Sequence, residues 1–206
     1  MRQSRKFKPK YAVVVDGETE FWYIQMLKRN GLINVDLNPQ IPQRKKLPEQ
    51  YSTAINLSKD YDKVYWIIDF DVINKETKEA KKGAKTASQK FKEYCDNIKK
   101  KYKNIVIIVN NPCFEYWLLL HFEATSKFYS SYDELIKQLK KHLPDYEKSR
   151  VYYTKQNNDI YLRLAPKLPD AIANAKKLTE FDFDNPYLGI SQMHFLFEEI
   201  KNQHCK

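Results

Sequence analysis

Short runs of consecutive hydrophobic residues recur along the first half of the chain. These runs are residues 12–15, 64–68 and 105–109. Residues 35–38 are a further short strand candidate, without a hydrophobic run, and they stop at Pro39. A strand that is hydrophobic at successive positions is typical of a sheet that is buried on both faces. The sequence therefore predicts four strands, and the hydrophobic runs are expected to be buried on both faces of the sheet.

Segments with apolar residues at helical spacing alternate with these strands. Three helices are expected here, from Thr19 to Asn30, from Pro48 to about residue 59, and over residues 86–101. This alternation predicts an α/β fold with right-handed crossovers and an open parallel sheet of about four strands.

The rest of the chain has a different pattern. Beyond Phe122 no strand is expected, and residues 132–142, 171–178 and 190–201 are predicted to be helical. With 206 residues, the chain is long enough for one well-buried core and a smaller appendage. We expect an α/β core in residues 1–125, which includes a basic N-terminal arm, and a mainly helical extension in residues 126–206.

Acidic side chains follow two of the predicted strands. Asp16, Glu18 and Glu20 come after the first run, and Asp69 and Asp71 come after the run at residues 64–68. Ligands of parallel sheets gather at the carboxyl ends of the strands. Crowded carboxylates repel one another unless a cation lies among them, and oxygen ligands suit Mg²⁺ or Mn²⁺. If the strand continues through both aspartates, the i and i+2 spacing points them the same way.

The fourth run leads into the segment NNPCFEYWLLLHF. Asn111 is a good N-cap and Pro112 suits the first helical position, so Glu115 is expected in the first helical turn at the same sheet edge. Complementing the helix dipole is the alternative role for Glu115, as it is for Glu20. Cys113 is interpreted as a small buried filler, and His121 and His194 as packing or surface residues.

The net charge of +10 favours a polyanionic partner. The lysines proposed to contact nucleic acid are Lys99, Lys100, Lys101, Lys148 and Lys155. The alternative is a lysine-rich surface that only keeps the protein soluble. Three scattered cysteines, no secretory signal and no long apolar run indicate a cytoplasmic protein without a membrane segment.

Three segments, DGETE, DFD and NPCFEYWLLLHF, in this order and spacing, resemble the RloB-like proteins, prokaryotic defence-associated members of the Toprim superfamily. The resemblance implies a Toprim-like fold in which divalent metal lies between an acid after the first strand and an Asp-x-Asp after the third. It assigns Asp69 and Asp71 to the metal-binding pair, and places Asp16 where Toprim proteins usually have glutamate. It also implies an association with ATPase partners.

Two functional hypotheses follow. The first is a metal-dependent nuclease acting on DNA or RNA in phage defence, with Asp16, Glu18 or Glu20 assisting proton transfer and Glu115 ligating a second metal or orienting water. Lys148 or Lys155 would neutralise transition-state charge, unless each is an ordinary surface lysine. The second is a catalytically weak nucleic-acid-binding or regulatory subunit, which the shorter side chain of Asp16 keeps open. The oligomeric state is left open, with a homo-oligomer allowed.

Overall fold

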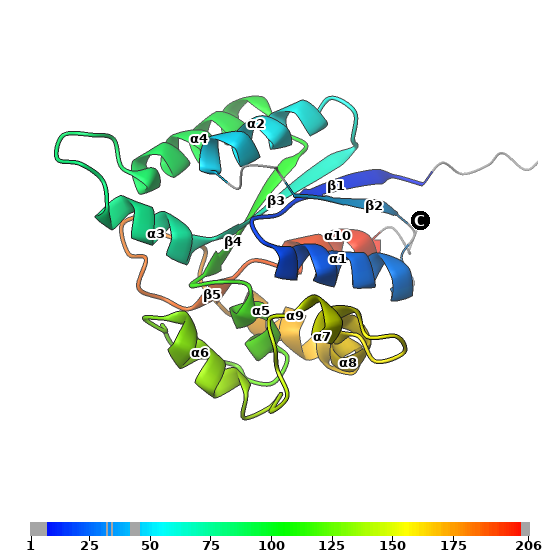
Figure 1. Ribbon diagram of the computed structural model, residues 1–206. Helices are drawn as coiled ribbons and strands as arrows, with labels where there is room; N and C mark the ends of the chain where they lie inside the picture. The colour runs from blue at the N-terminus through cyan, green and yellow to red at the C-terminus, as the bar shows by residue number, and fades with distance from the viewer. Residues whose placement is uncertain (1–7, 32, 34, 42–45, 203–206) are drawn as a thin grey trace, which may run out of the picture.

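The computed structural model describes residues 8–31, 33, 35–41 and 46–202, so most of the predicted basic arm lies outside the described residues. A five-stranded sheet forms its centre, in the order β2-β1-β3-β4-β5 (Figure 1). Neighbours among the first four strands are parallel, and β5 runs antiparallel to β4. The strands are β1 (Lys10–Val14), β2 (Asp36–Gln40), β3 (Lys63–Asp69), β4 (Ile105–Asn111) and β5 (Ile190–Ser191). The predicted α/β class and parallel sheet are confirmed.

Helices cover both faces of this sheet (Figure 1). Alternate strand residues such as Val13 and Ile67 pack in one core with α1 and α10, whereas Val14 and Trp66 pack in the other with α2, α3 and α4. The helices are α1 (Glu18–Asn30), α2 (Leu47–Leu57), α3 (Phe70–Lys78), α4 (Ala87–Lys101), α5 (Glu115–Leu120), α6 (Tyr132–Leu139), α7 (Arg150–Thr154), α8 (Ile160–Leu164), α9 (Leu168–Lys176) and α10 (His194–Asn202), with a 3₁₀ turn, η1 (Ala165–Lys167). Burial of both faces explains why the strand sequences are hydrophobic without alternation.

Four local predictions were wrong. The chain does form a strand beyond Phe122, because two residues of β5 pair with the end of β4, and α10 begins at His194 rather than at residue 190. Strand β2 continues through Pro39, which an edge strand tolerates. Asn111 is the last residue of β4, not a helix cap, and α5 begins only at Glu115.

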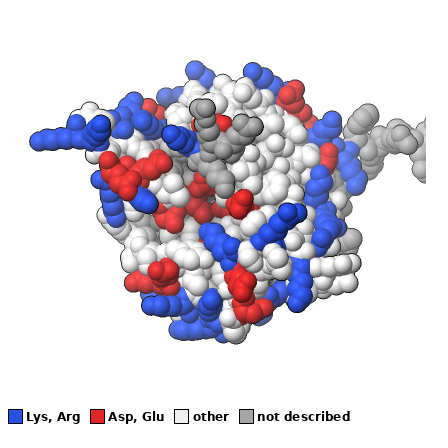
Figure 2. All heavy atoms as spheres, viewed as in Figure 1, with Lys and Arg blue, Asp and Glu red and all other residues white. Residues whose placement is uncertain are grey.

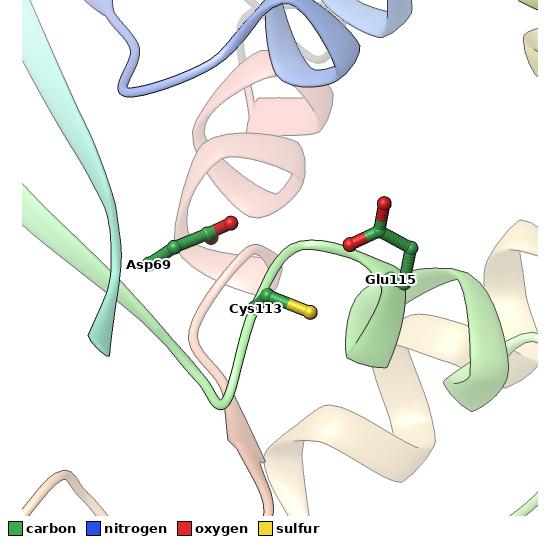
Figure 3. Close-up of side chains that lie close together, drawn as sticks. All are labelled: Asp69, Cys113 and Glu115. Carbon is green, nitrogen blue, oxygen red and sulfur yellow. The ribbon is translucent and has the colours of Figure 1, made fainter. Parts of the chain in front are cut away.

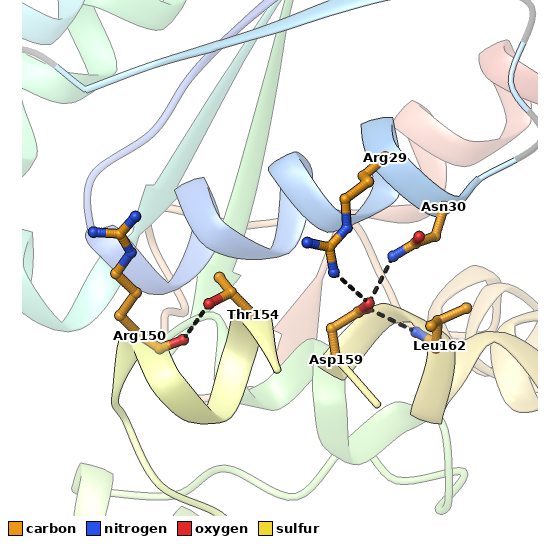
Figure 4. A network of polar contacts seen from close by, with 6 residues as sticks. All are labelled: Arg29, Asn30, Arg150, Thr154, Asp159 and Leu162. Atoms are coloured by element: carbon orange, nitrogen blue, oxygen red, sulfur yellow. Dashed lines mark hydrogen bonds and ion pairs between the residues drawn. The ribbon is translucent and has the colours of Figure 1, made fainter. Parts of the chain in front are cut away.

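A buried aspartate joins the end of α1 to α8 (Figure 4). Asp159 has no exposed surface, and its Oδ2 accepts hydrogen bonds from Arg29 Nη2 at 3.0 Å and Asn30 Nδ2 at 2.6 Å. Its Oδ1 accepts from the backbone N–H of Leu162 at 3.1 Å, which caps α8. Parts of the chain on either side of residue 125 also share one hydrophobic core, for example Tyr23 with Leu196. The division at residue 125 stays a prediction.

Candidate metal centre

A pocket of about 370 Å³ opens at the carboxyl edge of the sheet. Figure 2 shows acidic side chains gathered near the middle of this face, with Lys and Arg side chains around them. Most of the lining residues come from the end of β3 and from the segments that follow β1 and β3, whereas Cys113 follows β4 and Lys148 precedes α7. The full lining is Asp16, Gly17, Glu18, Thr19, Glu20, Trp22, Asp69, Asp71, Val72, Cys113 and Lys148. The structure thus brings together both acidic clusters that the sequence predicted.

Asp16 lies in the loop between β1 and α1 and is held by a side chain that the sequence analysis missed. Gln50 of α2 donates from Nε2 to Asp16 Oδ1 at 2.6 Å, and its Oε1 accepts from Trp66 Nε1 at 2.9 Å. Gln50 is only 3% exposed. A lone glutamine in a helix carries no recognisable signal, and only the crossing of α2 over β3 gives it this role.

The two glutamates of the first cluster differ in burial. Glu18 is exposed, whereas Glu20 is buried and accepts a hydrogen bond from Thr19 Oγ1 at 2.8 Å. Burial raises the pKa of Glu20, and the charge of Glu115 adds to the effect. Gly17 gives this carboxylate room, because a Cβ there would lie 2.7 Å from Glu20 Oε2. The buried glutamate therefore lines the pocket, and its role in the reaction stays a prediction beside the alternative of complementing the helix dipole.

Asp69 is the last residue of β3 and is buried. Asn110 Nδ2 lies 3.4 Å from Asp69 Oδ1, and Asn110 Oδ1 accepts from Ser191 Oγ of β5 at 2.7 Å. Burial raises the pKa of Asp69 well above its usual range, and the negative charges of Glu20 and its other acidic neighbours raise it further. Such a carboxylate is costly to ionise unless a cation is close.

Asp71 does not continue the strand as proposed. It lies in the first turn of α3, with its backbone N–H donating to the carbonyl of Pro112 at 3.0 Å. The chain turns from strand to helix directly after Asp69, so the two aspartates reach the pocket from different elements instead of by strand alternation. Burial also raises the pKa of Asp71.

Glu115 lies in the first turn of α5 with no exposed surface. Its Oε1 accepts from the Tyr146 hydroxyl at 2.8 Å and lies 3.1 Å from Lys148 Nζ, and the Tyr146 hydroxyl is 2.9 Å from that of Tyr153. Oε2 is buried with no hydrogen-bond partner among the described residues. Burial by itself lowers the pKa of Lys148. The negative charge of Glu115, together with those of Glu20 and Asp69, outweighs this effect, so the pKa of Lys148 is raised. Lys148 is therefore an ammonium ion directed at the site.

Cys113 lies between β4 and α5 beside two of these acids (Figure 3). One ligand atom each from Asp69, Cys113 and Glu115 lie within 4.8 Å of one another, and all three residues are buried. Burial raises the pKa of the Cys113 thiol well above its usual range. Cys113 is buried as predicted, but it also faces the acids, and this group can hold a metal ion. The sequence signal that could have indicated this role is the position of Cys113 two residues before Glu115.

The predicted nucleic-acid-binding lysines are not brought together. Lys148 lines the pocket, and Lys155 is exposed directly after α7. Lys99, Lys100 and Lys101 lie in the last turn of α4, which leads to the amino end of β4 and therefore lies at the other end of the sheet. Their role in binding stays a prediction.

The electrostatic balance of the pocket favours a cation. Six acidic side chains, counting Glu115 behind the wall, face one basic side chain among the described residues that line it. The fold and site together define an α/β protein with an acidic pocket, able to hold metal, at the carboxyl edge of a mainly parallel sheet, an arrangement consistent with a Toprim-like fold.

The sequence matches the family of RloB-like proteins over residues 11–200, and the chain belongs to that family. The three segments that suggested the family all fall within this range. No match was found among curated proteins or solved structures. In the described part of the chain, no helix has the length and apolar character needed to span a membrane.

Proposed function

We propose that this protein is a metal-dependent nuclease that hydrolyses phosphodiester bonds of DNA or RNA and acts in phage defence. The observation that carries the proposal is the convergence of Asp16, Glu20, Asp69 and Asp71 on one pocket with a single lysine. Burial raises the pKa values of Glu20, Asp69 and Asp71, so their carboxylates are costly to ionise unless a cation is close. Such a set of oxygen ligands suits a divalent cation. Family membership supports the proposal without assigning the activity.

In this proposal Asp16, Asp69 and Asp71 hold Mg²⁺ or Mn²⁺. A bound divalent ion would polarise a phosphodiester oxygen and favour a hydroxide nucleophile. Gln50 fixes the orientation of Asp16, and Asn110 that of Asp69. Lys148 stands ready to neutralise charge that develops on the phosphate.

The side chain of Asp16 is one methylene shorter than that of glutamate, so in this proposal Glu20 supplies the reach needed for proton transfer. Glu20 lines the same pocket, and burial raises the pKa of its carboxyl, which favours the protonated form that a general acid needs. Glu18 is exposed at the pocket rim, so we give it the lesser role.

A nucleic acid that approaches this acidic pocket needs positively charged side chains nearby, and a second pocket is lined by two lysines. It has a volume of about 290 Å³ and shares Asp71 with the first. Lys75 and Lys78, both exposed, line it at positions four and seven residues after Asp71, on one face of α3. Tyr187 is 67% exposed and its ring packs edge-on against Phe128, another lining residue, so an aromatic surface for bases lies beside the lysines.

The decisive experiment compares cleavage with binding in the same variants. Asp71→Ala should abolish Mg²⁺- or Mn²⁺-dependent cleavage while leaving nucleic-acid affinity nearly intact, because lysines supply most of the attraction. Asp16→Glu should keep or raise activity, and Asp16→Asn should remove it. Substrates should include duplex DNA, single strands and tRNA, with and without any ATPase encoded nearby, which we propose as a partner.

A binding or regulatory subunit is the second candidate. The pairing of Glu115 with Lys148 favours it, because this pair neutralises part of the buried charge without any metal. If the protein stays inert under all of these conditions, and if Asp71→Ala leaves phage protection unchanged, this candidate replaces the nuclease.

A further inference from the structure

A thiol and two carboxylates form a second group of candidate ligands at the acidic pocket, where Asp69 and Cys113 line the wall and Glu115 lies behind it. They come from three positions: Asp69 at the end of β3, Cys113 in the loop after β4, and Glu115 at the start of α5. Figure 3 shows the three side chains directed toward a common space. Their ligand atoms lie within 4.8 Å of one another, so a modest inward movement would let one ion reach all three at about 2.0 to 2.3 Å.

One oxygen distinguishes this group from a chance cluster of acids. Glu115 Oε2 is buried and lacks a hydrogen-bond partner among the described residues, although Glu115 has no exposed surface. Leaving a buried carboxylate oxygen unsatisfied is costly. The other oxygen is fixed by Tyr146 and Lys148, so the orientation of the carboxylate is set before a ligand arrives.

We propose that Asp69, Cys113 and Glu115 bind a borderline divalent ion such as Zn²⁺ or Co²⁺ through a thiolate, and that this position discriminates against Mg²⁺ and Mn²⁺. Mg²⁺ prefers oxygen ligands, whereas thiolate suits softer ions. On binding, the Cys113 S–H bond breaks, a sulfur–metal bond forms and the proton passes to solvent. Two carboxylates and the thiolate then carry three negative charges, which the ion and the Lys148 ammonium balance.

This inference deepens the proposed function, because Asp69 is shared with the proposed Mg²⁺ or Mn²⁺ ligands. It adds a metal position with a different preference beside the first. In a nuclease, the second ion would lie on the Glu115 side of the pocket.

The test is a titration of Co²⁺ into the whole metal-stripped chain, followed by near-ultraviolet absorption. A thiolate ligand gives a charge-transfer band that oxygen ligands do not give. The band should appear in the wild type and in Cys95→Ser, and should disappear in Cys113→Ser. Cys95, a partly buried residue of α4 outside the lining of the pocket, is the matched control.

A competition measurement gives the size of the effect. The affinity for Zn²⁺ should fall by roughly tenfold or more in Cys113→Ser, since a ligand lost directly from the metal should matter at least as much as one of its supporting contacts. If Cys113→Ser fails to fold, X-ray absorption of the Zn²⁺-loaded wild type replaces it and should show one sulfur at about 2.3 Å.

The inference is overturned if the wild type shows no such band, if Cys113→Ser keeps it, or if X-ray absorption finds only oxygen and nitrogen around the ion. These outcomes are separate from the fate of the proposed function. Mg²⁺-dependent cleavage without a thiolate band would leave the nuclease and remove the thiolate site. A thiolate band in a protein that shows no cleavage would support the thiolate site and contradict the nuclease proposal.

Discussion

The Tyr146 hydroxyl links the stability of the fold to the orientation of Glu115. It donates to Glu115 Oε1 at 2.8 Å and lies 2.9 Å from the Tyr153 hydroxyl, and all three residues are at most 2% exposed. A hydrogen bond to a charged group contributes about 1.5–3 kcal/mol to stability. For a domain of this size each kcal/mol moves Tm by about 2–4 °C, so Tyr146→Phe should lower Tm by roughly 3–12 °C.

The chain offers a control with the same chemical change and the opposite expectation. Tyr65 is 1% exposed, and its hydroxyl is buried with no hydrogen-bond partner among the described residues. Tyr65→Phe removes an unsatisfied polar group, so stability should stay unchanged or rise by up to about 1 kcal/mol.

Thermal and urea unfolding of both variants, in buffer with a chelator, measures these changes. Repeating the melts with Co²⁺ should show a smaller metal-induced shift in Tyr146→Phe than in Tyr65→Phe, because of these two tyrosines only Tyr146 contacts Glu115. Equal losses of stability in the two variants would refute the account of the Tyr146 hydrogen bond. Loss of stability without any change in the Co²⁺-induced shift would refute the link between this hydrogen bond and the metal centre.

Four further outcomes are expected. Mg²⁺ or Mn²⁺ should raise Tm by mass action, and the Asp69→Asn, Asp71→Asn double variant should lose most of that shift; equal shifts would remove the site. Gly17→Ala should slow cleavage with little change in Tm, because its Cβ displaces the flexible end of Glu20, and an unchanged rate would place Glu20 outside the reaction. Charge reversal at Lys75 and Lys78 should flatten the salt dependence of nucleic-acid binding more than reversal at Lys99 and Lys100, and the opposite order would move the binding surface to the other end of the sheet. Burial lowers the pKa of His121 from 6.5 to about 4, so the unfolded chain takes up the proton first; the folded state should lose up to about 3 kcal/mol as pH falls through that window, and the pH dependence of unfolding should lack this part in His121→Leu.

The hydrophobic pattern predicted the central strands because burial on both faces requires a run of consecutive hydrophobic residues, which is visible in the local sequence. Every residue of Val64–Ile68 must be apolar when helices cover both sides, so the run is visible without any knowledge of its neighbours. Strand β5 has no such hydrophobic run, because it consists of only two residues, Ile190–Ser191. Its two residues become a strand only because the end of β4 offers them a partner.

The candidate site divides in the same way. The sequence by itself determined that acids follow β1 and β3, and the common direction of parallel strands then required those acids to share one edge. Only the tertiary structure decided that Gln50 holds Asp16, that Tyr146 and Lys148 meet Glu115, and that Cys113 faces Asp69. These contacts join residues from 31 to 44 positions apart. Periodicity and capping depend on neighbours within a few residues, whereas such contacts depend on how helices cross the sheet, which is set by the packing of the whole core.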